Sequence, residues 1–253
     1  MRYGEFGMAY LPIEDYGVVG NMHTAALIGR NGSVDWLCLP DFDSPSVFCA
    51  ILDEKIGGHF SIHPANHDGL GKQFYLPETN ILITRFLLSE GVLEIMDYMP
   101  VGLDKGAAGF RQLIRRVEVI RGSVPIIVDF CPAFNYARDP HRVKLIDGGA
   151  LFESERFHLE LTTHIPLTVQ NECGGVKAQL DMKQGERAVF VLRPLEEAHR
   201  GKKVTGENED DLLKHTVHYW HRWLEQCTYR GRWREMVNRS ALTLKMLTYA
   251  PTG

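Results

Sequence analysis

The chain lacks a long apolar run, a cluster of basic residues and closely paired cysteines. Without a stretch of about 18 apolar residues, no membrane-spanning helix is expected, and the N-terminus has no apolar core of signal-peptide length. The formal net charge is −4, with no long run of one sign, which argues against binding to nucleic acid or to an anionic membrane. What is present is a globular composition, 44% hydrophobic over 253 residues, enough for a sizeable core.

Cysteine usage predicts a reducing compartment. The count is odd, the spacing is wide and no CxxC pair occurs, so we expect reduced, mostly buried thiols in a cytoplasmic protein. The same spacing is wrong for a metal site. The five are Cys38, Cys49, Cys131, Cys173 and Cys227.

Three histidines recur at every fourth position: His59, His63 and His67. On a helix this spacing would suggest metal ligands. The Gly57-Gly58 pair and Pro64 instead predict strand and loop, so that the three would not share a face. We therefore expect no metal site and no cofactor.

The middle of the chain, residues 58–195, has the pattern of a β domain. Apolar residues alternate on a period of two in segments such as FRQLIRRVEVI, and turn signals separate the segments, among them Ser89-Glu90-Gly91 and Gly122-Ser123. Many short strands at regular spacing predict an antiparallel sandwich or barrel. Residues 131–150 are expected to form a long loop, either functional or packed against a partner.

Two local signals precede this region. Asn31-Gly32 predicts a type I′ turn in a hairpin over residues 18–39. Ser44 as N-cap and Pro45 as first helical residue predict a short helix over 45–52.

After residue 208 the apolar period changes to that of helices. Five residues from Leu213 to Cys227 form one stripe, Gly231 interrupts it, and a second stripe begins at Trp233. The first stripe is Leu213, Val217, Trp220, Leu224 and Cys227, and the second is Trp233, Val237, Ala241, Leu244 and Leu247 with Thr248.

Two stretches resemble bacterial glycoside hydrolase family 15, the glucoamylase-like and trehalase-like proteins. The opening LPIEDYGVVGNMHTAALIGRNGSVDWLCLPDFDSPSVFCAILD resembles the family's N-terminal segment, and WREMVNRSALTLKMLTYAPTG resembles the start of its catalytic region. The resemblance implies a mainly β fold, an antiparallel β-supersandwich over 1–200, followed by a helical linker over 201–231. Residues 232–253 would then be the first helix of an (α/α)6 barrel. It also implies inverting hydrolysis of α-glucosidic bonds by two glutamates of the barrel, beyond the APTG motif, so no catalytic residue is expected in this chain.

The stretch SVDWLCLPDFDSPSVF holds the best local candidates, Asp35, Asp41 and Asp43. An inverting glycosidase needs an acid and a base about 6.5–9.5 Å apart. Asp43, however, precedes the expected helix start, where amide groups would lower its pKa, Asp41 suits a turn and Asp35 suits a strand. We interpret Asp41, Phe42 and Asp43 as an interface loop at the edge of a substrate pocket or partner domain.

Three functions remain open from the sequence. The first is the non-catalytic part of an α-glucosidase acting on trehalose or an α-glucosidic oligosaccharide, with the chain's own C-terminal barrel as its partner. The second is an α-glucan-binding sandwich without hydrolytic activity, and the third is a sandwich enzyme with its own carboxylate pair. Under the first, the helices dock the barrel, and the isolated chain self-associates through them. The expected docking residues are Trp220, Trp223, Trp233, Val237 and Leu244.

Overall fold

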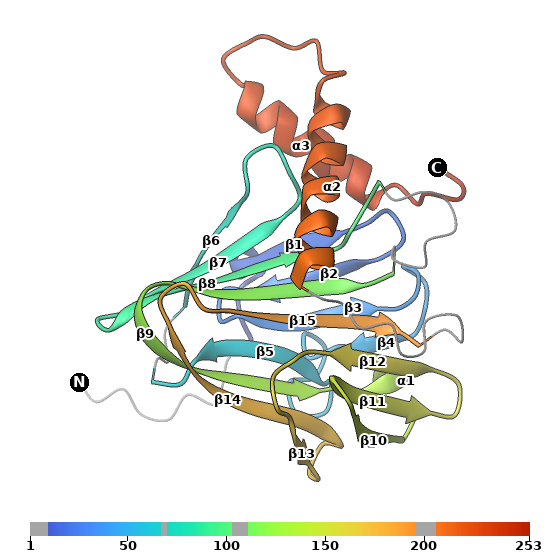
Figure 1. Cartoon of the computed structure of the whole chain (residues 1–253). Helices are drawn as coiled ribbons and strands as arrows, with labels where there is room; N and C mark the ends of the chain where they lie inside the picture. The colour runs from blue at the N-terminus through green and yellow to red at the C-terminus, as the bar shows by residue number, and fades with distance from the viewer. Residues whose placement is uncertain (1–9, 67–69, 103–110, 196–205) are drawn as a thin grey trace, which may run out of the picture.

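Two antiparallel sheets face each other, and two helices stand at one end of them (Figure 1). The structure is a computed structural model and describes residues 10–66, 70–102, 111–195 and 206–253. The predicted mainly β fold, an antiparallel supersandwich followed by helices, is confirmed. Within the described ranges, no helix has the length and apolar character needed to cross a membrane.

The first sheet joins the N-terminal strands to a late hairpin. Its order is β1-β2-β3-β5, then the second half of β9, then β14 and β13, with β4 beside β3. The preceding turn, η1, spans Ile13–Asp15. The strands are β1 (Tyr16–Gly20), β2 (Ala25–Gly29), β3 (Ser33–Cys38), β4 (Ser46–Phe48), β5 (His59–Pro64), β9 (Leu113–Cys131), β13 (Thr168–Gln170) and β14 (Gly175–Lys183).

The second sheet has the order β6-β7-β8, the first half of β9, then β15-β12-β11-β10. The turn predicted at Ser89-Glu90-Gly91 lies between β7 and β8, with Gly91 as the first residue of β8. The strands are β6 (Lys72–Tyr75), β7 (Leu82–Leu87), β8 (Gly91–Tyr98), β10 (His141–Ile146), β11 (Gly149–Ser154), β12 (His158–Thr162) and β15 (Arg187–Pro194).

Strand β9 belongs to both sheets, and the predicted turn at Gly122-Ser123 is wrong. Its first half pairs with β8 and β15, and its second half with β5 and β14. Gly122 has a φ of 77°, and it bends the strand from one sheet into the other without reversing it. A Cβ at this position would lie 1.9 Å from the carbonyl oxygen of Glu90, so the bend requires glycine.

Two local predictions before β5 are also wrong. Residues 45–52 hold no helix, because Ser46–Phe48 is a fully buried strand paired with β3, and this pairing overrides the Ser-Pro signal. In the β2–β3 hairpin only Gly32 has positive φ, at 85°. Its amide donates to the carbonyl of Gly29 at 2.9 Å, which is the pattern of a three-residue connection ending in a glycine bulge.

The segment 131–150 is not the predicted loop. It contains a short left-handed turn, α1 (Phe134–Ala137), in which Asn135, Tyr136 and Ala137 have positive φ, and the hairpin β10–β11. The hairpin adds two strands to the second sheet, so this segment is an edge of the sandwich.

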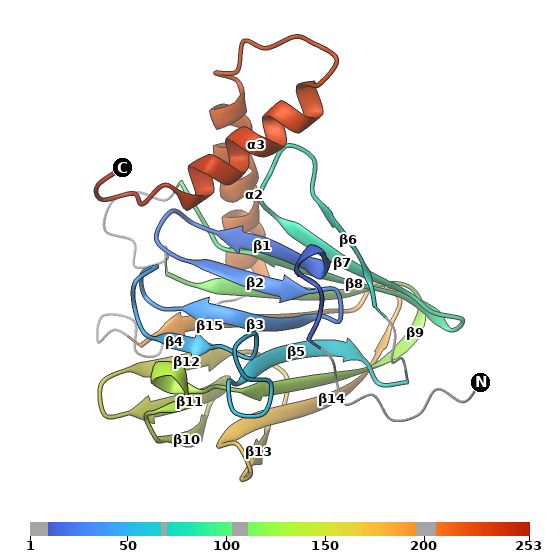
Figure 2. The same ribbon diagram turned by 180° about the vertical axis from the view of Figure 1, so that it is seen from behind.

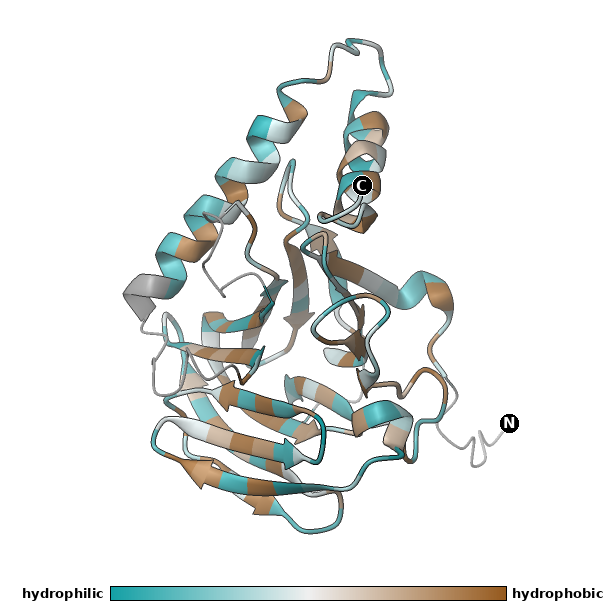
Figure 3. Cartoon of the chain, turned by 90° about the vertical axis from the view of Figure 1, so that its right-hand side faces the viewer, coloured by the Kyte–Doolittle hydropathy of each residue, from teal (hydrophilic) through white to brown (hydrophobic). Residues whose placement is uncertain are grey.

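Alternation along the strands builds the core between the sheets. Figure 3 shows hydrophobic and hydrophilic residues following one another along the strands. Phe130 lies at the centre, with ring centroids 5.1 Å from Phe60, 5.5 Å from Phe48 and 4.8 Å from Phe152. Such aromatic pairs add to the stabilisation from buried area.

Helix α2 (Gly206–Leu224) packs on the sandwich through its predicted stripe. Trp220 is 1% exposed and lies with Leu224 against residues of α3. At its start, Glu209 accepts a hydrogen bond from the Tyr98 hydroxyl at 2.7 Å. Arg116 of β9 pairs with Asp210 at 3.0 Å. These polar contacts anchor α2 to the second sheet.

Helix α3 (Arg234–Leu247) has a different buried face from the one expected. Its buried residues are Asn238, Leu242 and Met246. Leu242 and Met246 pack with Trp220 and Leu224 of α2, and Figure 2 shows the helix above β1 and in front of α2. The predicted stripe is largely on the other side, where Leu244 is 70% exposed and Trp233 is 52% exposed. The helix is therefore apolar on two faces, one of which is covered.

Candidate functional site

Three segments meet at one corner of the sandwich. They are the β1–β2 loop at 21–24, the β3–β4 loop at 39–45 and the segment after α3. The amide of Met22 donates to the carbonyl of Met246 at 3.2 Å, and the amide of Ala250 donates to the carbonyl of Met22 at 2.8 Å. The chain therefore leaves α3 along the β1–β2 loop.

The β1–β2 loop is fixed by its own side chains. The Asn21 side-chain oxygen accepts hydrogen bonds from the amides of His23 and Thr24 at 3.1 and 3.0 Å, which is an Asx turn. Met22 takes a φ of 67° in this turn. The Thr24 hydroxyl donates to the carbonyl of Cys38. These bonds hold the His23 ring beside the β3–β4 loop.

Asp41 is the centre of the corner. Its Oδ1 atom lies 3.5 Å from Nδ1 of His23 and 3.5 Å from the guanidinium of Arg111. Tyr249 bonds the same carboxylate, and burial together with the charges of Asp41 and Asp43 raises the pKa of the Tyr249 phenol. Asp41 therefore lies between two basic side chains, the imidazole of His23 and the guanidinium of Arg111.

The rings of the corner surround Tyr249. Phe42 lies 6.2 Å from it in an edge-on arrangement, and His23 lies 5.8 Å from it. Asp43 is exposed. The structure thus brings Asp41 and Phe42 together with groups that offer hydrogen-bond donors, acceptors and an apolar ring. Such a set can hold the hydroxyl groups and the apolar face of a sugar.

Asp35 is separate from this corner and serves the fold. It accepts hydrogen bonds from the Tyr16 hydroxyl at 2.8 Å and from the Ser33 hydroxyl at 2.5 Å. It is 8% exposed.

A groove of about 1190 Å³ runs between α3 and the strand β6 with the loop that follows it. Trp233 stands at its rim with the guanidinium of Arg232 4.5 Å from the ring centroid. Glu78 in the groove pairs with Arg234 at 3.7 Å and accepts from the Asn238 amide at 3.2 Å. The lining residues are Phe74–Glu78, Arg232–Met236, Asn238–Ser240 and Leu242.

The sequence model of one family, described as "Trehalase-like, N-terminal", matches residues 2–220. The chain belongs to this trehalase-like N-terminal family. The match covers the sandwich and most of α2. It confirms the family resemblance inferred from the opening motif.

Curated relatives of this trehalase-like domain are named trehalase. The trehalase of Thermoplasma acidophilum is 37% identical over 229 residues, 90% of this chain and 39% of the relative. That of Thermoplasma volcanium is 34% identical over 248 residues, and that of Mycolicibacterium smegmatis is 33% identical over 269 residues; each match covers 96% of this chain and 39% of the relative. The chain therefore spans well under half of the length of these relatives. Among solved structures, the family GH92 alpha-mannosidase of Bacteroides thetaiotaomicron aligns with 89% of this chain and 38% of its own, at 12% identity and a TM-score of 0.42.

Sequence reasoning missed three residues of the corner in this trehalase-like domain: His23, Arg111 and Tyr249. Arg111 and Tyr249 lie far from Asp41 along the chain, and no local pattern links them to it. His23 stands within the quoted opening motif, in NMHT. Its presence in that motif was the one signal that could have pointed to it.

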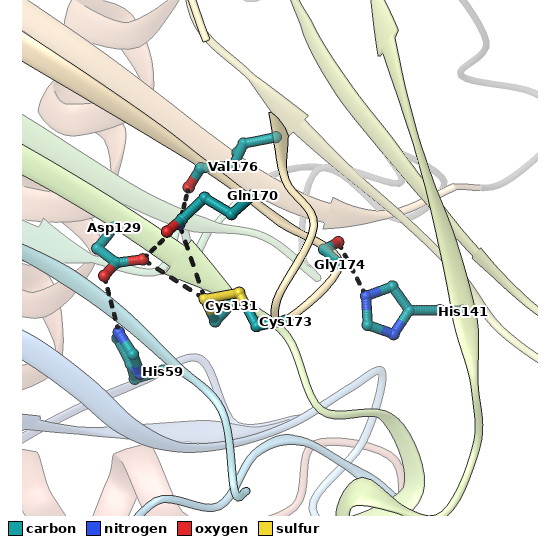
Figure 4. The surroundings of a disulfide bond; sticks show 8 residues. All are labelled: His59, Asp129, Cys131, His141, Gln170, Cys173, Gly174 and Val176. Atoms are coloured by element: carbon teal, nitrogen blue, oxygen red, sulfur yellow. Dashed lines mark hydrogen bonds and ion pairs between the residues drawn. A yellow bond between two sulfur atoms is a disulfide. The ribbon is translucent and has the colours of Figure 1, made fainter. Parts of the chain in front are cut away.

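The prediction that all cysteines are reduced thiols is wrong for two of them. Cys131 and Cys173 form a disulfide across 42 residues (Figure 4). Pairing of β9 with β14, whose residue Gly175 lies just after Cys173, brings the two sulfurs together. Cys38 and Cys49 are free and buried, as expected. The cytoplasmic location stays a prediction.

The histidines also differ from expectation. His59 and His63 both lie on β5, where residues four apart share a face of the strand. Both lower the pKa of the carboxyl group of Asp129 on the neighbouring β9. The hydrogen bond from His59 has the larger effect, and the charge of His63 has a smaller one. His67 lies outside the described residues.

Proposed function

We propose that this chain is the non-catalytic N-terminal part of an intracellular, inverting, trehalase-like α-glucosidase, and that it supports and docks the catalytic region. The family match and the trehalase names of the relatives support trehalose as the substrate of the whole protein. The remainder of the relatives' length is the proposed place of the catalytic barrel and of its two glutamates. Residues 1–200, 201–231 and 232–253 are then the sandwich, the linker and the first barrel helix.

The observation that carries this proposal is the second apolar face of α3. An ordinary surface helix has one apolar stripe, which packs on its own domain. Here that role is filled by Leu242 and Met246, both at most 1% exposed. A second apolar row begins at the residue before the helix and is exposed, and its first two members also line the groove. Its members are Trp233 at 52%, Met236 at 64%, Leu244 at 70% and Leu247 at 49% exposure.

The exposure of their side chains divides the expected docking residues into two groups. Trp220 is buried within the chain, and Trp223 is partly buried with the ammonium group of Lys245 4.9 Å from its ring. These two fix the helices to each other and to the sandwich. Trp233 and Leu244 are free to contact a further domain, and Val237 is partly exposed beside them.

We place the corner around Asp41 at the edge of the substrate pocket of the whole protein. It adjoins the segment by which the chain leaves α3, so residues that follow would pass close to it. We assign Asp41 and Phe42 to positioning of the neighbouring domain or of a sugar, with Asp43 exposed at the rim.

Two-chain reconstitution tests the proposal. The 253-residue chain alone should not hydrolyse trehalose, maltose or soluble starch, and it should restore trehalose hydrolysis when mixed with the separately produced remainder of the protein. Leu244→Asp should weaken that complex at least about tenfold, as expected for a central interface residue. The control is Leu145→Asp, a change at a leucine of β10 with 45% exposure. Turnover by the chain alone, abolished by Asp41→Asn, would favour an independent sandwich enzyme instead.

An α-glucan-binding module is the second candidate, favoured by the aromatic rings at the groove. Phe74 is 38% exposed and Trp233 is 52% exposed, and both line it. Titration of the chain with maltoheptaose, followed by tryptophan fluorescence, separates the two functions. Binding of maltoheptaose that is abolished by Trp233→Ala would support the glucan-binding module. Unchanged fluorescence on titration would instead support docking of the catalytic region.

A further inference from the structure

Four side chains with metal-binding atoms converge beside the disulfide. His59 comes from β5, Asp129 and Cys131 come from the end of β9, and Cys173 comes from the turn between β13 and β14 (Figure 4). The ligand atoms of His59, Asp129 and Cys131 all lie within 4.8 Å of one another. Pairing of β5 with β9 fixes the positions of His59, Asp129 and Cys131, and the disulfide holds Cys173 beside them.

The separations of the histidine nitrogen and the Cys131 sulfur from the Asp129 carboxylate are in the range of a zinc ligand set. Nitrogen and oxygen ligands at about 2.0–2.2 Å and sulfur at about 2.3 Å from zinc lie roughly 3.3–3.8 Å from one another. Nε2 of His59 is 3.5 Å from Oδ2 of Asp129, and Sγ of Cys131 is 3.5 Å from Oδ1 of the same carboxylate. The Cα atoms of Cys131 and Cys173 are 5.7 Å apart, so a second sulfur is within reach.

We propose that the reduced form of this cluster binds one zinc ion through Cys131, Cys173, His59 and Asp129. A dithiol reductant supplies two electrons and two protons, which convert the disulfide to two thiols while the reductant becomes a disulfide. Zinc then forms two Zn–S bonds, and the two thiol protons leave to water. The two sulfurs are thus bonded to each other in the oxidised chain and to the metal ion in the reduced chain.

The surroundings suit a metal ligand set. The Gln170 amide donates to Oδ1 of Asp129 at 2.7 Å and to the carbonyl of Val176 at 3.2 Å, and this fixes the orientation of the carboxylate. The side chains of His59 and Asp129 are 31% and 34% exposed, which leaves a path for the ion.

Cobalt(II) is the probe for this site, because tetrahedral thiolate coordination gives visible d–d bands and a sulfur-to-cobalt charge-transfer band. The whole chain is reduced with a dithiol, freed of it without air and titrated with Co²⁺. We expect one Co²⁺ per reduced chain, displaced by Zn²⁺, and none per oxidised chain. His59→Ala should lower the affinity more than about 100-fold, and Gln170→Ala by about 10–100-fold as a positioning residue.

Matched variants distinguish this site from the other thiols. Cys227→Ser and His158→Ala change a free cysteine and an exposed histidine elsewhere, and both should bind Co²⁺ as the unaltered chain does. The double variant Cys131→Ser/Cys173→Ser should lose the charge-transfer band. Because this variant also lacks the disulfide, it could fail to fold. His59→Ala keeps both cysteines, so a loss of Co²⁺ affinity in His59→Ala tests the site independently of the double variant. Equal binding by oxidised and reduced chains, or binding unchanged in His59→Ala, would overturn the proposal.

Discussion

Arg115 and Asp97 form an ion pair that is sealed from water inside the sandwich. Both side chains are 0% exposed, and Nε of Arg115 lies 2.8 Å from Oδ1 of Asp97. The same guanidinium donates to the carbonyl of Gly32 at 2.7 Å and to that of Phe60. The arginine therefore ties β8 and β9 of one sheet to backbone groups of the other.

Removing one member of this pair should be costly. Asp97→Ala leaves a buried positive charge without its partner, which typically costs about 3–5 kcal/mol. The control is Glu94→Ala on the same strand, since Glu94 pairs with Arg85, whose side chain is 41% exposed, and such pairs are worth at most about 1 kcal/mol. Urea unfolding measures both, and similar losses would contradict the burial argument.

Gly122→Ala should destabilise the protein more than Gly185→Ala. Both glycines have positive φ, 77° and 82°, and an L residue there costs about 1–2 kcal/mol. At Gly185 a Cβ meets nothing within 4 Å, whereas at Gly122 it collides with backbone. We expect the difference in unfolding free energy to exceed about 1 kcal/mol, measured by urea unfolding. Equal effects would mean that the bend of β9 tolerates a side chain.

Acidification should weaken the protein through His141. Burial lowers the pKa of His141, against a smaller opposing effect of its bond to the Gly174 carbonyl at 3.0 Å. The unfolded chain, with an ordinary pKa of about 6.5, then binds more protons, so stability falls as the pH drops below about 6.5. The slope is at most about 1.4 kcal/mol per pH unit for one group. His141→Gln should reduce this slope between pH 7 and 5, and His164→Gln, a change at an exposed histidine, should not.

The isolated chain should self-associate through the outer row of α3. Sedimentation velocity over a range of concentrations should show a dimer or larger species, since exposed apolar faces of this kind pair with one another. Leu247→Glu should shift the chain to monomer, and Leu145→Glu should leave it unchanged. A chain that stays monomeric at every concentration, with α3 intact by circular dichroism, would contradict this.

Short-range patterns predicted the elements where packing agreed with them. Short apolar segments between turn signals predicted β7, β8 and β15, and the helical stripe of α2 is visible in the sequence because one face of that helix is buried. The same patterns failed at Gly122 and at Ser46–Phe48. There the outcome depends on pairing with other strands: Gly122 bends β9 and does not reverse the chain, and the residues after Ser44-Pro45 form a short buried strand beside β3.

The candidate sites were predicted less well than the fold. Asp41 and Phe42 lie in one loop, so their proximity could be inferred. Tyr249 and Arg111 join them only through the tertiary fold, as Cys173 joins Cys131. Pairings of this kind depend on strand order and register, which no local pattern contains.

The membership of β9 in both sheets has a consequence for synthesis of the protein. Its first half needs β15, which ends at Pro194, and its second half needs β14. A nascent chain adds about 5–20 residues per second, so β9 emerges from the ribosome seconds before these two partners. During that interval its long apolar edges have no neighbour on one side. We expect ribosome-bound chains stopped before residue 175 to recruit chaperones, and chains stopped well beyond residue 194 to release them.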